Sequence, residues 1–295
     1  MLGSIFAISS AFFWACAVIM FKKCGKVFSP ISLNIYKSLV AAVLIALTMM
    51  ILNIPFFPER PMNDWLLLAL SGFLGITLAD MFFFMALNRL GAGLVAIVEC
   101  FYLPSVILFS FILLGEQLSP QAVIGGIMVL SAVFIGSYTK KRTKKNKTEK
   151  KDLLIGIIAG STSVILLAIG IVMIKEILEQ TDVFWATFVR VAAGLVSLLI
   201  IVAFHPKKKQ YLDELKFSRA WVVALPASVC GNFIALLFWV AGMKYTTASQ
   251  AGILNQMSTI FIFILAAFFL KERITVNRSI AIAVAVTGAC LTIFG

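Results

Sequence analysis

The stretch LGEQLS at residues 114–119 returns as LKERIT at residues 270–275, so the second half of the chain repeats the first. Once small shifts are allowed, the repeat extends over most of the 295 residues. Matched pairs include Gly3 with Gly156, Met20 with Met173, Lys22 with Lys175, Lys37 with Arg190, Trp65 with Trp221, and Gly75 with Gly231. A self-match of this length in an apolar chain is typical of membrane proteins built by duplication.

The composition predicts an all-α membrane protein. Hydrophobic residues make up 61% of the chain and charged residues only 13%, far from the mixture of a soluble domain. Most of its apolar runs have about the ~20 residues that cross ~30 Å of hydrocarbon, and backbone groups in lipid must be satisfied within the segment, so the runs are expected to be helices. The ten runs are 2–21, 31–52, 65–87, 92–114, 121–138, 153–174, 183–204, 220–242, 248–270 and 279–294.

Basic residues between the runs predict the orientation. Most of the 25 Lys and Arg residues lie in turns that share one side of the molecule, here called the basic face: 22–29, 88–91, 139–152, 205–219 and 271–278. The opposite side holds Arg60, Lys175 and Lys244. The positive-inside rule places the basic face in the cytoplasm and both termini outside. Because this explanation is sufficient for the net charge of +12, no nucleic-acid partner is expected.

The repeated turn predicts that the two halves face opposite ways. The copy at 114–119 carries no basic residue, whereas the copy at 270–275 carries two. Each half has five apolar runs, an odd number, so the same turn lies outside in one half and inside in the other. We therefore expect an all-α membrane protein with ten transmembrane helices as two inverted five-helix repeats, residues 1–138 and 153–295.

The segment 139–152 is predicted to be a solvated basic linker between the repeats, because it is polar and has no apolar period. Two roles stay open for it. It is either a simple orientation signal or a segment that anionic lipid headgroups attract, so membrane lipid is one expected partner.

Only four ionisable residues lie within the apolar runs: Lys37, Asp80, Glu99 and Arg190. Each costs ~3 kcal/mol to place in hydrocarbon, so these positions are candidates for function. Lys37, Asp80 and Glu99 are all roughly 10–14 Å from the cytoplasmic ends of their helices, which predicts a cluster of three. Repulsion between its two carboxylates would let one of them hold a proton near neutral pH. Two alternatives stay open: Lys37 extends its ammonium to the interface, or the carboxylates are structural hydrogen-bonding groups.

In the second half the basic position is kept and the acids are lost, because Leu236 and Asn255 stand where the first half has its two carboxylates. Arg190 is therefore expected to lie among amides, with Asn232, Asn255 and Gln256 as neighbours. An unpaired guanidinium in such surroundings would bind the carboxylate of a ligand in a forked geometry. The alternative is that Arg190 takes a carboxylate from the first half across the repeat interface.

Aromatic residues and prolines complete the predicted site. Trp14 and Tyr102 each carry a polar group on an apolar ring, which makes them the best aromatic candidates for lining a cavity. Most other aromatic side chains are expected to fill the core or face lipid. Pro104 and Pro226 each remove a backbone hydrogen bond and can bend their helices.

No enzyme chemistry is found in the sequence. It contains no HExxH, no GxSxG, no Walker lysine loop and no Cys/His set with metal-ligand spacing. The chain is therefore predicted not to be an enzyme and to need no cofactor or metal. Any pumping is expected to use an ion gradient or the gradient of the substrate itself.

Several short motifs recur at fixed places in the apolar runs and their turns: NIYK at 34–37, FVR at 188–190, ALNRLGA at 86–92, and the repeated turn at 114–119 and 270–275. Together they resemble the EamA-type family of the drug/metabolite transporter superfamily, over nearly the whole chain. The resemblance implies ten helices around a central cavity, and export of amino acids, other metabolites or drugs. Glu116 and Glu272 match the turn glutamate of the family and are expected to cap helices. Many members resemble one another in having both termini in the cytoplasm, whereas the charge count here places them outside.

We therefore expect a multi-pass secondary transporter of the cell membrane, the bacterial inner membrane, that exports a small zwitterionic or anionic metabolite such as an amino acid. Arg190 or Lys37 would hold the anionic group of the substrate. Asp80 and Glu99 would carry a proton or pair with an amine. Two alternatives stay open: a proton-coupled exporter of lipophilic cationic drugs that uses Glu99, and a membrane scaffold or lipid-binding protein with no transport cycle. Either a monomer or a homodimer fits the sequence.

Overall fold

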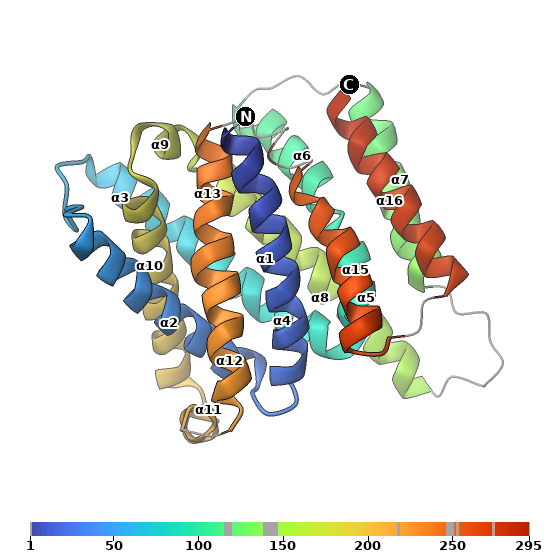
Figure 1. Ribbon diagram of the computed structural model, residues 1–295, viewed down its shortest axis with the longest axis horizontal. Helices are drawn as coiled ribbons and strands as arrows, with labels where there is room; N and C mark the ends of the chain where they lie inside the picture. Colours follow the sequence, from blue (N-terminus) through green and yellow to red (C-terminus); the bar gives the residue numbers. More distant parts are fainter. Residues whose placement is uncertain are drawn as a thin grey trace.

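Helices make up every secondary-structure element in the described part of the computed structural model (Figure 1), so the all-α prediction is confirmed. The structure describes residues 2–114, 120–137, 147–216, 219–245, 251, 254–272 and 275–294. The predicted cap Glu116 and most of the predicted linker 139–152 lie outside the described residues.

The helices of the first half are α1 (Leu2–Cys24), α2 (Pro30–Ile51), α3 (Met62–Gly72), α4 (Asp80–Leu90), α5 (Ala92–Glu99), α6 (Tyr102–Leu114) and α7 (Pro120–Ser137). Those of the second half are α8 (Lys147–Val172), α9 (Lys175–Gln180), α10 (Val183–Phe204), α11 (Lys208–Glu214), α12 (Trp221–Ser228), α13 (Leu236–Tyr245), α15 (Met257–Phe269) and α16 (Val276–Phe294). Two π-helical segments join α3 to α4 and α12 to α13: η1 (Phe73–Ala79) and η2 (Val229–Ala235).

Seven helical stretches in the described ranges are long and apolar enough to cross a membrane: Leu2–Cys24, Pro30–Ile51, Met62–Leu90, Ala92–Leu113, Lys150–Val172, Val183–Phe204 and Trp221–Tyr245. Two further apolar helices, Met257–Phe269 and Val276–Gly288, are shorter. The start of α1 and the end of α16 lie at the same edge of the bundle, away from the basic face, which is at the bottom of Figure 1.

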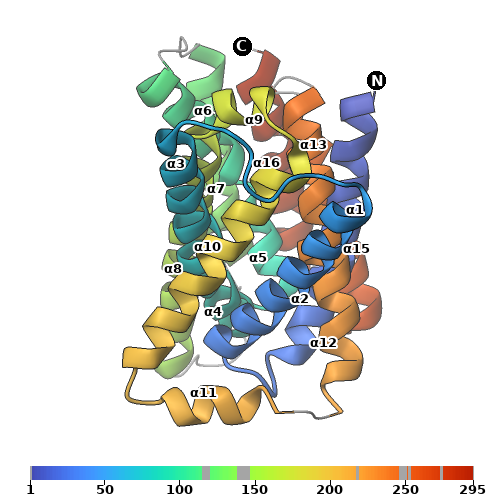
Figure 2. The same ribbon diagram turned by 90° about the vertical axis from the view of Figure 1, so that its left-hand side faces the viewer.

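Helices from equivalent places in the two halves of the sequence pack against each other. The last helix of each half, α7 and α16, lie side by side at one end of the molecule (Figure 1). At the other end α2 contacts α10, and the short helix α11 lies along the basic face beneath them (Figure 2). Between these ends α1 packs on α13 and α15, so each half contributes to the same core.

The π-helical segments are held by serines from the opposite half. A π-helix contains a wider turn than an α-helix, and such turns occur often at functional sites. The Ser163 hydroxyl of α8 donates to the carbonyl of Ala79, the last residue of η1, at 2.7 Å. The Ser10 hydroxyl of α1 donates to the carbonyl of Ala235, the last residue of η2, at 2.8 Å. The two bonds stand at matching positions of the sequence repeat.

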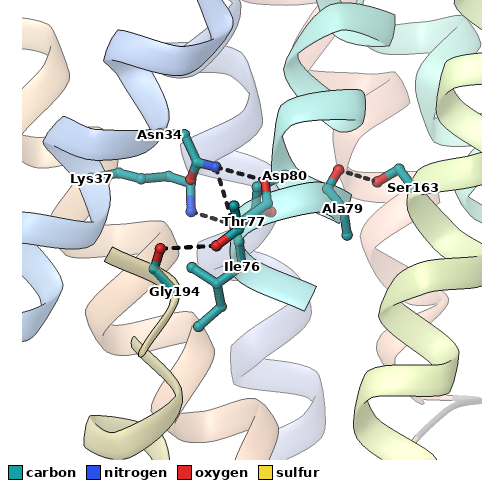
Figure 3. A network of polar contacts seen from close by, with 8 residues as sticks. All are labelled: Asn34, Lys37, Ile76, Thr77, Ala79, Asp80, Ser163 and Gly194. Atoms are coloured by element: carbon teal, nitrogen blue, oxygen red, sulfur yellow. Dashed lines mark hydrogen bonds and ion pairs between the residues drawn. The ribbon is translucent and has the colours of Figure 1, made fainter. Parts of the chain in front are cut away.

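Side chains of α2 and η1 also fix η1 in place (Figure 3). Asn34 Nδ2 donates to the carbonyl oxygens of Ile76 and Thr77, at 2.8 and 3.2 Å. Thr77 Oγ1 donates to the carbonyl of Gly194 on α10 at 2.8 Å. Buried backbone groups need such partners, so these bonds stabilise the irregular segment. They set the position of Asp80, which directly follows η1.

Gly72 allows α3 to touch the backbone of α10. A Cβ atom added at Gly72 would overlap the backbone carbonyl oxygen of Arg190, which cannot rotate away. We expect Gly72→Ala to lower the free energy of unfolding by about 1–3 kcal/mol, the usual cost of overpacking a core. Thermal unfolding in detergent, followed by tryptophan fluorescence, measures this change.

A matched control for this variant is Gly242→Ala. A Cβ atom at Gly242 would meet Ala7 at 3.4–3.5 Å, an ordinary van der Waals separation. Equal unfolding midpoints for the two alanine variants would contradict the close approach of α3 and α10.

Candidate functional site

A cavity of about 130 Å³ lies between helices of both halves. Nearly all of the side chains predicted from the sequence as site residues line it: Trp14, Asp80, Glu99, Tyr102, Arg190, Asn232, Asn255 and Gln256. Lys37 is not on the cavity wall. The structure therefore brings together polar residues that lie far apart in the sequence.

Lys37 is linked to the cavity wall by an ion pair with Asp80. Its ammonium lies 2.5 Å from Asp80 Oδ2, and only 1% of its side chain is exposed (Figure 3). The Asp80 side chain is 18% exposed and lines the cavity. The alternative in which Lys37 reaches the membrane interface is wrong, because its ammonium is held inside the bundle by this ion pair.

Glu99 has a partner other than the one expected. The indole Nε1 of Trp14 donates to Glu99 Oε1 at 3.2 Å, and Glu99 Oε2 is buried with no hydrogen-bond partner among the described residues. The ion pairs of the described residues do not include Glu99. The predicted cluster of three is thus a Lys37–Asp80 pair and a separate Glu99–Trp14 pair. The prediction treated the helices as straight rods, whereas η1 widens the helix just before Asp80 and directs that side chain to α2.

Arg190 is buried and has no carboxylate partner in the described part of the chain. Its Nε donates to Ser71 Oγ at 3.0 Å, and Ser71 Oγ donates in turn to the Gly170 carbonyl at 2.5 Å. Only 2% of Arg190 is exposed, and its Nη1 atom is buried without a hydrogen-bond partner in the described ranges. No direct ion pair with a first-half carboxylate is present among the described residues, but Asp80 lines the same cavity and its charge acts on Arg190, so this alternative stays open.

Several other polar atoms on the cavity wall lack partners within the described residues. They include Tyr102 OH and Asn232 Oδ1, both buried. The Tyr102 ring packs edge to face on Trp239, with 5.9 Å between the ring centroids, and Trp14 packs on Phe83 at 5.3 Å. Unpartnered buried polar atoms are costly, and they often mark places that a ligand or water satisfies. The unpartnered atoms on the described part of the wall are thus one guanidinium nitrogen, one hydroxyl and two oxygens, from Arg190, Tyr102, Glu99 and Asn232.

Sequence reasoning missed several contributors to the cavity and its support. Ser71 fixes Arg190, and no sequence signal distinguishes it from other small residues on apolar helices. Ser10 lines the cavity, and its place opposite Ser163 in the sequence repeat was a signal that could have found it. The remaining wall residues are Gly75, Ile76, Val164, Leu167, Gly231, Ala235, Leu236, Trp239 and Ser258.

Glu272 lies outside the cavity and caps a helix, as expected. Its two carboxylate oxygens accept hydrogen bonds from the backbone N–H groups of Ala92 and Gly93, at 2.8 and 3.1 Å. These residues are the first two of α5, where a negative charge is favourable.

The cavity lies among apolar helices of two similar halves, and the family comparison agrees with both features. The model of the EamA-like transporter family matches residues 1–138 and 154–294. The chain belongs to this family. The EamA resemblance of the sequence is thereby confirmed. The protein is a membrane transporter with several membrane helices, and as a member of a transporter family it is not an enzyme.

Curated relatives are transporters without an assigned substrate. An "Uncharacterized transporter" of Archaeoglobus fulgidus is 27% identical over 282 residues, 93% of this chain and 92% of the relative. The "Uncharacterized transporter YvbV" of Bacillus subtilis is 24% identical over 79% of this chain and 73% of its own length. The "Uncharacterized inner membrane transporter YhbE" of Escherichia coli is 21% identical over 47% of this chain and 43% of its own. A crystal structure with a TM-score of 0.70 and 16% identity, covering 98% of this chain and 95% of its own, shares the fold.

Proposed function

We propose that EamA-family transport in this protein is export of a small zwitterionic or anionic metabolite, with amino acids as the leading class, across the bacterial inner membrane. The observation that carries this proposal is the cavity-lining guanidinium of Arg190. It is buried, and within the described residues its Nη1 has no partner and none of the ion pairs includes it. A buried guanidinium without a direct ion pair has a free site for a forked, charge-assisted contact, so it would bind a ligand carboxylate.

The other cavity groups fit the rest of such a molecule. The amine of a zwitterion would lie toward the carboxylates of Glu99 and Asp80, with Tyr102 OH and Asn232 Oδ1 as further polar contacts. Apolar atoms of the substrate would pack on the rings of Trp14 and Trp239. A volume of about 130 Å³ favours a small metabolite over a drug, because pockets for drug-sized ligands measure ~300–1,000 Å³.

We further propose that ten helices cross the membrane as two inverted repeats, 1–138 and 153–295, joined by the linker 139–152. The family match to residues 1–138 and 154–294 supports this division. The serine-held segments η1 and η2, which occupy matching places in the repeat, support it independently. Rocking of one half against the other would open the cavity to each side in turn.

A second candidate is the proton-coupled export of a lipophilic cation. It is favoured by one observation, the buried Glu99 carboxyl group, whose Oε2 atom has no partner in the described ranges. Against it, Arg190 lines the same cavity and would repel a cation.

Metabolite profiling of the medium tests these proposals because it surveys many candidate substrates at once. Cells that overexpress the protein are expected to enrich one or a few zwitterionic or anionic metabolites in the medium, and deletion cells to retain them. Uptake or release of each candidate by proteoliposomes then measures transport directly. A changed tolerance of cationic dyes with no change in metabolites would favour the second candidate. No change in either would contradict both proposed substrate classes.

A further inference from the structure

The short helix α5 is the first part of the apolar stretch Ala92–Leu113, and it runs from the basic face to the cavity. It begins at Ala92 on the basic face and ends at Glu99 on the cavity wall, and its eight residues span ~12 Å. Cys100 and Phe101 form a turn between α5 and α6. Pro104 explains this break, because it removes the N–H that a continuous helix would bond to the Cys100 carbonyl. A rod with a break at the cavity end can turn about that end.

At the basic face, α5 is held by the opposite half of the protein. Glu272 follows α15, and both of its carboxylate oxygens accept hydrogen bonds from α5, those from Ala92 and Gly93. Arg278 Nη1 lies 3.4 Å from Glu272 Oε2 and holds the carboxylate in place. Hydrogen bonds to a charged acceptor are about twice as strong as neutral ones, so this is a strong contact between the halves.

The glycines on either side of Ala92 allow the Glu272 carboxylate to approach the backbone at the start of α5. Gly91 has a φ of 80°, and a Cβ atom added there would lie 2.8 Å from Glu272 Oε1. A Cβ atom at Gly93 would lie 3.0 Å from Glu272 Oε2. The turn is therefore shaped to admit the carboxylate of Glu272.

At the cavity end, α5 also contacts α15. Cys100 Sγ lies 3.3 Å from Thr259 Oγ1, and Thr259 Oγ1 donates to the Ala96 carbonyl at 3.3 Å. Between the two ends, the buried side chains of α5 belong to the apolar cluster that fills the bundle on the side of the basic face: Leu94, Val95, Ala96, Ile97 and Val98. The contact of α5 with α15 therefore runs from the cavity wall to the basic face.

We propose that α5 is the gate of the cavity toward the basic face and that Glu272 is the latch that holds it shut. The proposal rests on the proposed alternating access, because the two halves must separate at this contact when the cavity opens to the basic face. Release of Glu272 frees the far end of α5, which then turns about its near end, where Glu99 lies on the cavity wall. The state of the gate is thereby coupled to a carboxyl group on the cavity wall.

The native thiol of Cys100 reports on this gate. It is fully buried between α5 and α15, so its reaction with a small water-soluble methanethiosulfonate measures their separation. The full-length protein in lipid nanodiscs would be treated with the reagent, and mass spectrometry of the Cys100 peptide would give the labelling rate. We expect Glu272→Ala to raise this rate by about tenfold or more, because two charge-assisted hydrogen bonds to α5 are lost.

Two further variants make the result specific. Gly93→Ala keeps the charge of Glu272 but places a Cβ atom against its carboxylate, and it is expected to raise the Cys100 rate as well. Glu179→Ala removes another glutamate of the second half, which is 55% exposed and pairs only with Lys175 among the described residues, and it is expected to leave the rate unchanged. Thermal unfolding midpoints check that each variant is folded.

An unchanged Cys100 rate in both folded gate variants would overturn the proposal. If Glu272→Ala fails to fold, Gly93→Ala alone decides between the two outcomes. Because labelling needs no substrate, the result is independent of the export assay. If the Cys100 labelling rates change as expected but no metabolite is exported, the latch proposal is supported and the proposed function is rejected.

Discussion

Asp80→Leu is expected to destabilise the protein by about 3–5 kcal/mol, the cost of removing one partner of a buried ion pair. The variant leaves the Lys37 ammonium buried, with 1% of its side chain exposed, and takes away the carboxylate that lies 2.5 Å from it. Leucine is a suitable replacement because Leu236 occupies the same place in the second half of the repeat. The loss of stability is therefore assigned to the uncompensated charge rather than to the size of the new side chain.

The double variant Lys37→Met/Asp80→Leu is the matched test of this explanation. It removes both charges together, and replacement of a buried ion pair by apolar residues is often neutral or stabilising. We expect its unfolding free energy, measured by reversible denaturation in detergent, to return to within about 1–2 kcal/mol of the wild type. A double variant that is as unstable as Asp80→Leu would show that the pair is not the source of the effect.

The same double variant separates stability from transport. If Asp80 acts on the substrate, the stable double variant should still lose export, because the cavity wall has lost the Asp80 carboxylate. If the pair is structural, which is the alternative that the sequence left open, export should persist. The stability measurement and the transport measurement therefore answer two different questions.

Much of the cavity could be predicted from the sequence because charge in a membrane is rare. Lys37, Asp80, Glu99 and Arg190 were found from their place within apolar runs, and the structure places all but Lys37 on one cavity. The repeat, which shows where the second half has lost its acids, pointed to Asn232, Asn255 and Gln256, and these line the same cavity as Arg190. These signals can be seen in a single sequence because ionisable groups within a membrane are costly and are therefore rare.

The partners of these residues could be predicted only in part. Lys37 was expected near Asp80 and pairs with it, whereas Glu99 was expected in the same cluster and instead accepts a hydrogen bond from Trp14. Nothing in the residues 73–79 or 229–235 marks the π-helical segments, one of which lies directly before Asp80. The hydroxyl group of Ser71 could not be assigned to Arg190 because no sequence signal distinguishes it from other small residues on apolar helices. Small shifts in helix register determine which of several polar residues at similar depth becomes the partner. Composition and periodicity do not predict such shifts.

Arg190→Gln is expected to reduce transport of a carboxylate substrate by about a hundredfold or more. A forked pair of charge-assisted hydrogen bonds contributes ~3–6 kcal/mol when each bond is worth ~1.5–3 kcal/mol, and every 1.4 kcal/mol corresponds to a factor of ten. Glutamine keeps a polar group that can bond to Ser71 but removes the charge on the cavity wall. Because no direct ion pair of the described residues includes Arg190, removal of its buried charge is not expected to unfold the protein.

Arg190→Lys and Ser71→Ala test whether the effect comes from the charge, the planar fork or the position of the Arg190 guanidinium. Lysine keeps the charge but lacks the planar fork, so we expect an intermediate loss of transport. Ser71→Ala removes the hydrogen bond to Nε and leaves the guanidinium in the cavity, so a smaller loss is expected, through poorer positioning of Arg190. Proteoliposome assays of the substrate found by profiling measure all three variants. Wild-type transport by Arg190→Gln would remove Arg190 from substrate binding and would favour a ligand without a carboxylate, such as the lipophilic cation held at Glu99.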